Sequence, residues 1–454
     1  MKAATAELLG SSPPGESHHE GDAYAVVHVV VQEMHKSIVE TQVLDHMEIQ
    51  ATAPGALAPA NVSVLLLEPL RHAVRPGTLA RRRRLARRAP HVRVSLGPYV
   101  GRLGVGRNAS LLARLVRRLG RGHPVVLHCR SEEAVLWALA IRSHMRGGAV
   151  VADMRGIWPE EFLHARGYDS VEAAAADEGA MQGYRYALSR MREALEGSDA
   201  ILAVSEALVS WVDEHIPQRP PATVVPCCVS SVDGDAGARD RVRAELGLTG
   251  KTVLCYVGSA ERYQHLEDGF ARFCSIAVAL HGPDRMHVLC LTPAVDRVSG
   301  ILVGAGVPTT ALTVMQVPQS RVGGYLLAAD AGFLLRDGSP VNRVSVPVKL
   351  GEYLAAGVPV VTSSLLEWTR DLLEGSSGSI AIDWFGIPDD ARVRQVEHVL
   401  ALLTHDHAAL RAEALSLARR RFTWRAHVDG VRETYRAALR AHSIVSAAPL
   451  AQSR

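Results

Sequence analysis

No apolar run in this sequence approaches the roughly 18 residues that a helix needs to cross a bilayer. Residues 1–21 are polar and lack the apolar core of a secretory signal peptide. The six cysteines show no C-x-x-C spacing and lie mostly in apolar runs, which argues against a zinc site or a disulfide framework. Aromatic residues make up only 5% of the chain, so the cores should consist of Val, Leu, Ile and Ala. These features predict a cytoplasmic globular protein with buried, reduced thiols.

Lysine is scarce, because only Lys2, Lys36, Lys251 and Lys349 occur among 50 basic residues. All of the other basic residues in this count are arginine. A lysine in such a sequence is therefore expected where its compact point charge matters, for example against a phosphate. This makes Lys349 a candidate binding residue.

Acidic residues are absent between Arg71 and Arg121, where fifteen arginines occur. Because the whole chain carries only +3, the remainder is net negative. A solvated basic helix over Leu79–Arg88 is one explanation, and an anionic membrane surface is another. A nucleic-acid partner is not predicted, because the stretch lacks the interleaved aromatics of a stacking platform. If the stretch binds lipid, the protein is peripheral on the inner membrane face.

Short apolar runs alternate with longer amphipathic segments along the whole chain, which predicts an α/β fold with parallel sheets between helices. At 454 residues the chain is long enough for two such domains. The expected strands are Tyr24–Val31, Asn61–Leu67, His91–Leu96, Pro124–Cys129, Ala149–Met154, Ile201–Val204, Thr252–Val257, His287–Leu291, Leu312–Gln316, Gly332–Leu335, Pro359–Thr362 and Ser379–Ile382.

The domain boundaries follow from the composition. A proline-rich segment at Pro217–Pro221 and a Gly/Asp linker at Ser230–Gly237 separate the two halves. The predicted organisation is a disordered tail at 1–21, a Rossmann-like domain at 22–225, a second at 226–422, a helix at 423–442 and a tail at 443–454.

The segment Ser345–Val361 predicts a short helix that leads into a buried strand. Pro347 is expected at the first helical position, with Ser345 or Val346 as the cap and Gly357 just past the end. Lys349 and Glu352 are three residues apart and share one helix face. A helix start with a lysine suits a diphosphate, and the glutamate suits ribose hydroxyls. A weak, solvated Lys–Glu pair is the alternative.

Three segments carry a family resemblance. Pro347–Val361 resembles the donor-site signature of family 4 glycosyltransferases. Ala152–Glu161 resembles their D-x-R-G-x-W-x-E-E segment, and Asp199–Leu208 is similar to the strand and serine turn before their interdomain crossing.

The resemblance implies a GT-B fold, in which two doubly wound Rossmann-like domains face each other across a cleft. It also implies a retaining, metal-independent glycosyltransferase that needs no cofactor. The donor would be a nucleotide-activated sugar bound by the second domain. The acceptor would be a glycan, a lipid-linked glycan or a small molecule on the first domain, as in cell-envelope polysaccharide biosynthesis.

On the donor side, the resemblance places Gly258 and Ser259 in a turn that approaches the diphosphate. Relatives often carry Arg and Lys after this glycine, whereas here Ser259 and then Gln264 or His265 occupy those places. Arg262 or Arg343 is the expected replacement. Relatives also carry a first glutamate at the position of Val344, so this chain has only the second one, Glu352.

On the first domain, the resemblance gives tentative catalytic roles to His128, Arg130 and Asp153. Relatives often have H-x-H at the first two positions, and Arg130 cannot act as a base. A core histidine and a purely structural Asp153–Arg155 ion pair are the alternatives.

Lys36, Arg155 and Glu160 are expected on the acceptor side. Two other functions stay open from the sequence. One is a sugar-nucleotide epimerase on the same fold. The other is a degenerate, non-catalytic protein that binds nucleotide-sugars, which the replacements at Val344 and Arg130 suggest.

Overall fold

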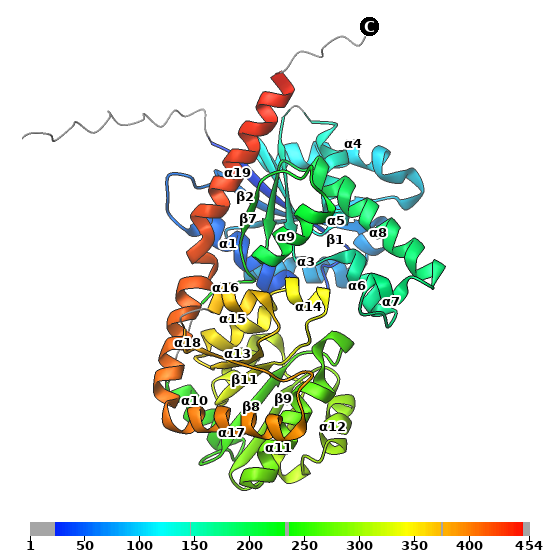
Figure 1. Ribbon diagram of the computed structural model, residues 1–454. Helices are drawn as coiled ribbons and strands as arrows, with labels where there is room; N and C mark the ends of the chain where they lie inside the picture. Colours follow the sequence, from blue (N-terminus) through cyan, green and yellow to red (C-terminus); the bar gives the residue numbers. More distant parts are fainter. Residues whose placement is uncertain (1–22, 146, 232–235, 374–375, 448–454) are drawn as a thin grey trace, which may run out of the picture.

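The protein contains two parallel β-sheets flanked by helices, one above the other in Figure 1. The computed structural model describes residues 23–145, 147–231, 236–373 and 376–447. Within those ranges no helix has the length and apolar character that a membrane span requires. The predicted pair of doubly wound α/β units is confirmed. The expected tail at 1–21 and the middle of the Ser230–Gly237 linker lie outside the described residues.

The first sheet has seven parallel strands in the order β3-β2-β1-β4-β5-β6-β7. Its central strands are continuous apolar runs, as expected for parallel strands that are covered on both faces. The strands are β1 (Ala25–Val31), β2 (Asn61–Pro69), β3 (Arg93–Tyr99), β4 (Val125–Arg130), β5 (Ala149–Met154), β6 (Ala200–Ala203) and β7 (Ala222–Val224).

The second sheet has six parallel strands in the order β10-β9-β8-β11-β12-β13. The strands are β8 (Thr252–Val257), β9 (Met286–Leu291), β10 (Leu312–Met315), β11 (Ala331–Leu334), β12 (Val360–Ser363) and β13 (Ser379–Ile382). In both sheets the order reverses beside the first strand of the unit. This switch point is where doubly wound sheets bind ligands.

Helices connect consecutive strands in both units. Those of the first are η2 (Val39–Leu44), α1 (Asp45–Thr52), α2 (Leu70–Ala73), α3 (Pro76–Arg88), η3 (Gly101–Leu103), α4 (Gly104–Gly120), α5 (Glu132–Arg142), α6 (Trp158–Ala165), α7 (Val171–Ala174), α8 (Glu178–Gly197) and α9 (Glu206–His215). Those that follow are α10 (Ala236–Glu245), η4 (Arg262–Gln264), η5 (Leu266–Ala271), α11 (Arg272–His281), α12 (Val295–Gly304), η6 (Thr309–Ala311), α13 (Gln319–Leu326), α14 (Pro340–Val344), α15 (Val348–Ala355), α16 (Glu367–Leu373), α17 (Asp389–His405), α18 (His407–Arg421) and α19 (Trp424–Ala447).

Helix α19 returns from the second unit and packs along the first (Figure 1). Its Arg432 is fully buried, and Nη2 donates to the carbonyls of Gln50 (3.1 Å) and Ala53 (2.7 Å). The Tyr435 hydroxyl lies 2.7 Å from Nδ1 of His128 on β4. These contacts join the last helix of the chain to the centre of the first sheet.

Helix α15 begins one residue later than the sequence predicts. Pro347 has extended backbone angles (φ −72°, ψ 140°) and is the N-cap, so Ser345 and Val346 lie outside the helix. The Pro347 carbonyl accepts from the N–H of Leu350 (3.0 Å), and Ser345 Oγ donates to the Val341 carbonyl instead of capping. Gly357, with φ +65°, follows the helix end as predicted.

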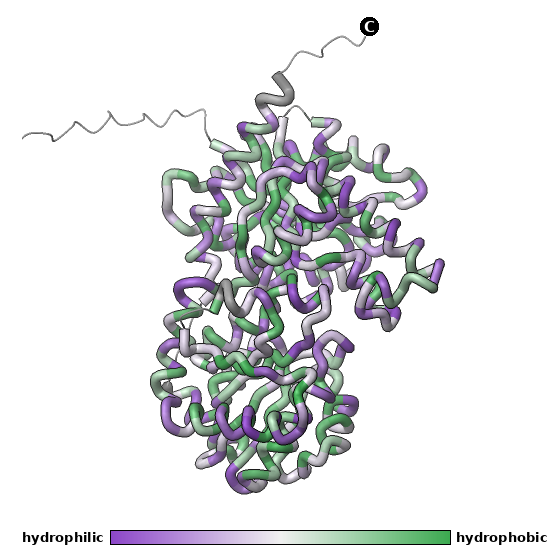
Figure 2. Tube along the Cα trace, in the orientation of Figure 1, coloured by the Kyte–Doolittle hydropathy of each residue, from purple (hydrophilic) through white to green (hydrophobic). Residues whose placement is uncertain are grey.

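Apolar residues gather on the strands in the middle of each unit, whereas hydrophilic residues lie mostly on outer helices (Figure 2). All six cysteines are buried and free, as predicted. One apolar cluster includes residues from both units, among them Leu208 of α9 and Leu350 of α15. The two units therefore share part of their core.

The predicted basic helix exists as α3, but its arginines differ in their environment. Arg81 is buried, where Nε donates to the Met34 carbonyl (3.0 Å) and the guanidinium pairs with Glu40. Arg88 pairs with the buried Asp45 at 2.6 Å. Arg83 and Arg84 are exposed. Only part of the basic run is therefore available to a partner surface.

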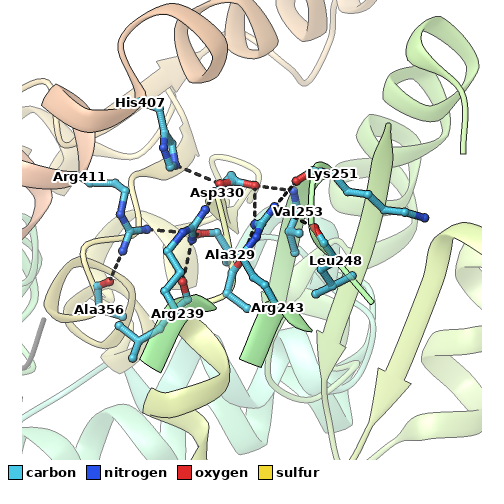
Figure 3. Close-up of polar contacts among 12 residues, drawn as sticks. Arg239, Arg243, Leu248, Lys251, Val253, Ala329, Asp330, Ala356, His407 and Arg411 are labelled. Atoms are coloured by element: carbon cyan, nitrogen blue, oxygen red, sulfur yellow. Dashed lines mark hydrogen bonds and ion pairs between the residues drawn. The ribbon is translucent and has the colours of Figure 1, made fainter. Parts of the chain in front are cut away.

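A buried carboxylate, Asp330, joins several segments at the amino ends of β8 and β11 in the middle of the second sheet (Figure 3). Its oxygens accept from the N–H of Val253 (2.7 Å) and pair with Arg239, Arg243 and His407. Burial opposes ionisation of this carboxyl. The His407 hydrogen bond and the two guanidinium charges nevertheless hold its pKa far below the usual value.

Asp330→Asn should lower the free energy of unfolding by about 3–5 kcal/mol, because the partly buried Arg239 and Arg243 lose their counter-charge. Since the folded pKa is depressed, this stabilisation is complete above the usual pKa of 3.8 and is lost as the pH falls below it. In urea denaturation, the difference in the free energy of unfolding between wild type and variant should therefore become smaller from neutral pH towards about pH 2.

Asp390→Asn is the matched control, since Asp390 forms an exposed pair with Arg394. It should change the free energy of unfolding by less than about 1 kcal/mol. Equal effects of the two substitutions would contradict the role of Asp330.

Candidate functional site

A cavity of about 1050 Å³ lies between the two units. It is lined by residues that follow β4, β5 and α6 in the first unit, and β8, β11 and α14 in the second. Strand carboxyl ends of both sheets thus meet at one site, as expected for this fold class. The charged residues of the lining are Arg130, Arg155, Arg166, Arg262, Arg336, Lys349, Glu161 and Glu261.

Lys349 on the first turn of α15 points into the second unit's side of this cavity. Its Nζ is buried, lies 5.1 Å from the centroid of the Tyr256 ring and has no hydrogen-bond partner among the described residues. Burial, aided by the charge of Arg336, lowers the pKa of Lys349 to about 7. This geometry excludes the solvated Lys–Glu pair that the sequence left open.

Gly258 lets Lys349 take this position. A Cβ at residue 258 would lie 2.0 Å from Nζ of Lys349, and the φ of +139° is strained for any other residue. Ser259 lines the cavity, and its carbonyl accepts from the Tyr256 hydroxyl (2.5 Å). The turn after β8 therefore leaves room for the lysine and for a ligand beside it.

Arg336 is the second buried cation of this region, and the sequence reading missed it. It follows β11 and is 3% exposed, its Nη2 donates to Oε1 of Gln264 (2.9 Å), and its Nε has no described partner. Burial lowers its pKa. The only available signal was an arginine directly after an apolar strand. Gln264 is one of the two residues expected where relatives carry a cation, and here it accepts a hydrogen bond from a cation that follows the neighbouring strand.

The two arginines proposed from the sequence have other partners. Arg262 donates to Asp169 Oδ2 (2.8 Å) and to the His164 carbonyl (3.3 Å), so it bridges the two units at the rim of the cavity. Arg343 is exposed, pairs with Glu367 and does not line the cavity.

Glu352 lies one turn beyond Lys349 and lines a neighbouring cavity of about 480 Å³. One oxygen of its carboxylate accepts from Nε2 of Gln319 (3.1 Å). Val348 lines both cavities. The two candidate donor residues of α15 therefore lie on adjoining hollows rather than in a single one.

Asp153 at the end of β5 is the buried anchor of the first unit's side. Arg155 Nη2 lies 2.6 Å from one carboxylate oxygen, and His128 Nε2 lies 3.3 Å from the other. Burial opposes ionisation, but the Arg155 charge and His128 hold the pKa of Asp153 well below its usual range. The ion pair considered from the sequence is therefore present.

His128 is fully buried between Asp153 and Tyr435. Its ring stacks on His28 with centroids 4.3 Å apart. Arg130, two residues on, lines the cavity, and its Nη1 is buried without a described partner. The β4 end thus offers the cavity a guanidinium, whereas its histidine faces the core.

The remaining acceptor-side candidates lie outside the large cavity. Lys36 is exposed and pairs with Glu33 at 2.7 Å. Glu160 Oε1 accepts from Trp211 Nε1 (3.1 Å) and the Tyr184 hydroxyl (3.3 Å). Glu161 faces the cavity instead. Adjacent helical residues point about 100° apart, so the choice between them depends on how α6 packs.

Ser205 of the third sequence motif links the two units. Its hydroxyl caps α9 by accepting from the N–H of Leu208 (3.0 Å) and donates to the Val344 carbonyl (2.6 Å). Val344 is buried, and it stands where relatives carry the first glutamate. This position therefore contacts the other unit through its backbone.

Residues 57–231 match the family model described as Glycosyltransferase Family 4. No curated protein sequence is significantly similar to this chain. Among solved structures, sucrose-phosphate synthase from Thermosynechococcus elongatus is similar, with TM-score 0.63, 14% identity and coverage of 93% of this chain and 100% of that one. Anabaena HepE in complex with UDP is similar with TM-score 0.62 and 12% identity, and the match covers 90% of this chain and 99% of that one. A glycosyltransferase from Rickettsia africae is similar with TM-score 0.63 and 11% identity, and the match covers 92% of this chain and 99% of that one.

These structural likenesses, at such low identity, establish the fold. The family match covers less than half of the chain and includes the Asp153–Arg155 segment of the first unit. The chain thus has the fold of the GT-B glycosyltransferases, with a region similar to glycosyltransferase family 4.

Proposed function

We propose that the protein transfers a sugar from a nucleoside-diphosphate donor, held by the second unit, to an acceptor on the first. The carrying observation is that Lys349 and Arg336 are both buried in one cavity, each with a nitrogen that lacks a described partner. Buried cations without counter-charge are costly, so the site suits an anionic ligand. A diphosphate is the anion of the donor class that GT-B enzymes use.

The solved relatives support this choice of donor. Three solved structures of HepE are complexes with UDP, with UDP and glucose, and with UDP-glucose. We therefore take UDP as the probe nucleotide for this chain. A screen of thermal stability with UDP, GDP, ADP and TDP would rank the bases, because a ligand at about 100 times its Kd adds roughly 2.7 kcal/mol.

The proposed chemistry follows from the charges. Negative charge develops on the diphosphate as the sugar leaves, and Lys349 and Arg336 would stabilise it in a partly water-excluded site. Two cations from the chain can fill the role that a metal has in other transferases, so the proposed reaction is metal-independent. Retention of configuration is proposed from the family resemblance. Neither His128 nor Arg130 is assigned as a base or nucleophile.

Lys349→Met should weaken UDP binding about 10- to 150-fold, since a charge-assisted hydrogen bond is lost. Uridine binding should change little. Because Lys349 has a pKa of about 7, UDP affinity of the wild type should fall as the pH rises through neutrality, and the variant should lose this dependence. Calorimetry with both ligands across this range tests the proposal.

Lys251→Met is the control, because Lys251 is on the surface of the second unit, where its Nζ donates to the Pro283 carbonyl (3.3 Å). It should leave both affinities unchanged. Equal losses of UDP and uridine in Lys349→Met would show that this lysine supports only the structure.

Glu352→Gln should weaken UDP and uridine by the same factor, about 10-fold, if the carboxylate accepts from ribose hydroxyls. The adjoining hollow at Val348 supports this placement of the nucleoside. Gln319→Ala removes the amide that donates to Glu352 but keeps the carboxylate. It should therefore weaken UDP and uridine binding less than Glu352→Gln does. If Glu352→Gln leaves the uridine affinity unchanged, the ribose does not bind at Glu352.

A membrane-bound acceptor is supported by a surface that combines arginine with exposed apolar side chains. Among the described residues, exposed large apolar side chains concentrate in or beside the acid-free stretch, at Leu70, Val74, Leu79, Val100, Leu103, Val105 and Leu111. Most follow β2 or β3, which are neighbouring strands, so the two segments lie at one end of the sheet. Such a surface suits the headgroup region of an anionic leaflet.

Replacing Arg83, Arg84 and Arg87 by serine should reduce flotation with anionic vesicles, because each basic residue near such a surface contributes about 1 kcal/mol. Arg81 is left intact because it is buried. Serine at Arg285, Arg297 and Arg394, exposed residues of the second unit, provides the control. Equal partitioning of the wild type onto neutral and anionic vesicles, or none, would refute membrane binding.

A further inference from the structure

A second cavity, of about 410 Å³, opens beside the large one on the first unit. It is lined by the residues that follow β1, β4 and β5, three neighbouring strands at the centre of the sheet. Arg130, Arg155 and Glu161 line both cavities, so the two spaces adjoin. A group bound here would lie next to a donor bound at Lys349.

Most of the charged residues that line this small cavity are acidic. Glu33, Glu132, Glu133 and Glu161 line it together with Asp153. Arg155 is occupied by Asp153 at 2.6 Å, so it does not neutralise the glutamates. Burial raises the pKa of Glu132 to about 7, and the nearby charge of Glu161 adds to the rise. These two carboxyl groups, from α5 and α6, therefore face a common space.

One donor group accompanies the carboxyl groups. Nη1 of Arg130 is buried, belongs to a residue that lines the cavity, and has no hydrogen-bond partner among the described residues. A buried, unsatisfied donor is costly unless a ligand supplies an acceptor. The cavity thus presents hydrogen-bond acceptors on Glu132 and Glu161 and a donor on Arg130.

This combination discriminates between classes of ligand. At a pH above 7, where Glu132 is ionised, a phosphate would satisfy Arg130 but would be repelled by the glutamates, and an ammonium group would satisfy the glutamates but would be repelled by Arg130. A hydroxyl group donates and accepts, so a pair of vicinal hydroxyls can satisfy both sides without a net charge.

We propose that this cavity is the acceptor subsite and that it binds an uncharged polyol, such as a neutral sugar ring. Glu132 and Glu161 accept from its hydroxyl groups, and Arg130 donates to a hydroxyl oxygen. The assignment to an acceptor rests on the proposed function, whereas the preference for a neutral ring rests on the cavity itself. An acceptor that carries phosphate beside its accepting hydroxyl is disfavoured.

The test compares glucose, glucosamine and glucose 6-phosphate by ligand-detected NMR titration of the full chain, with and without UDP. Glucose should bind the wild type at least about 10-fold more tightly than either charged sugar. Glu132→Gln/Glu161→Gln should raise the affinity for glucose 6-phosphate relative to glucose by about 10-fold. Arg130→Gln should do the same for glucosamine.

Glu196→Gln, at an exposed position of α8, is the matched control and should keep the wild-type order. The midpoint of thermal unfolding serves as the measure of an intact fold in every variant, because Arg130 and Glu161 also line the cavity assigned to UDP. The single substitutions Glu132→Gln and Glu161→Gln replace the double variant if it fails that measure. Tightest binding of a charged sugar by the wild type, no binding of any of the three, or an order unchanged in the variants would overturn the inference.

The two proposals fail in different ways. If the donor proposal is wrong, UDP will not bind, or Lys349→Met will leave the UDP affinity unchanged. The order of the three sugars can still be measured without UDP. A normal UDP response with no preference for glucose would refute only the acceptor subsite.

Discussion

The docking of α19 onto the first unit is the constraint on which the cleft depends. The helix begins where Thr423 forms a bridge with Val229, so the two crossings between the units are held together. Arg432 is then buried against main-chain carbonyls near the end of α1, and Trp424 stacks on His46 with ring centroids 4.2 Å apart. A guanidinium that satisfies several carbonyls tolerates little displacement, because unpaired buried groups are costly. The carboxyl ends of both sheets are thereby held facing one another.

Both units place charged side chains in the cavities of this cleft. The second unit presents Lys349 and Arg336, and the first presents Glu132 and Glu161 beside Arg130. The Asp153–Arg155 pair lies between these regions and is internally neutral. A donor with a diphosphate and an acceptor with hydroxyl groups would each meet the side that suits it.

The histidines show how a sequence motif can serve the core. His28 and His128 stack at paired positions of β1 and β4, and burial lowers the pKa of His28 well below its usual value. His128 contacts Asp153 on one side and Tyr435 of α19 on the other. It therefore links the crossing helix to the strand end that carries Arg130. A substitution of His128 would therefore affect the site by disturbing the packing of α19 and β4.

The sequence alone determined the two parallel sheets, because their strands are continuous apolar runs that need no distant partner to be recognised. It also singled out Lys349 as a candidate, since lysine is so rare in this chain, and predicted that Asp153 and Arg155 lie at the end of a buried strand. Only the tertiary structure decided that Arg336 replaces Arg262 and Arg343 as the second buried cation, and that Glu161 rather than Glu160 faces the cleft. Periodicity reports which residues are buried along one element. The partner that each charge meets depends on how separate elements pack, and that information is not local.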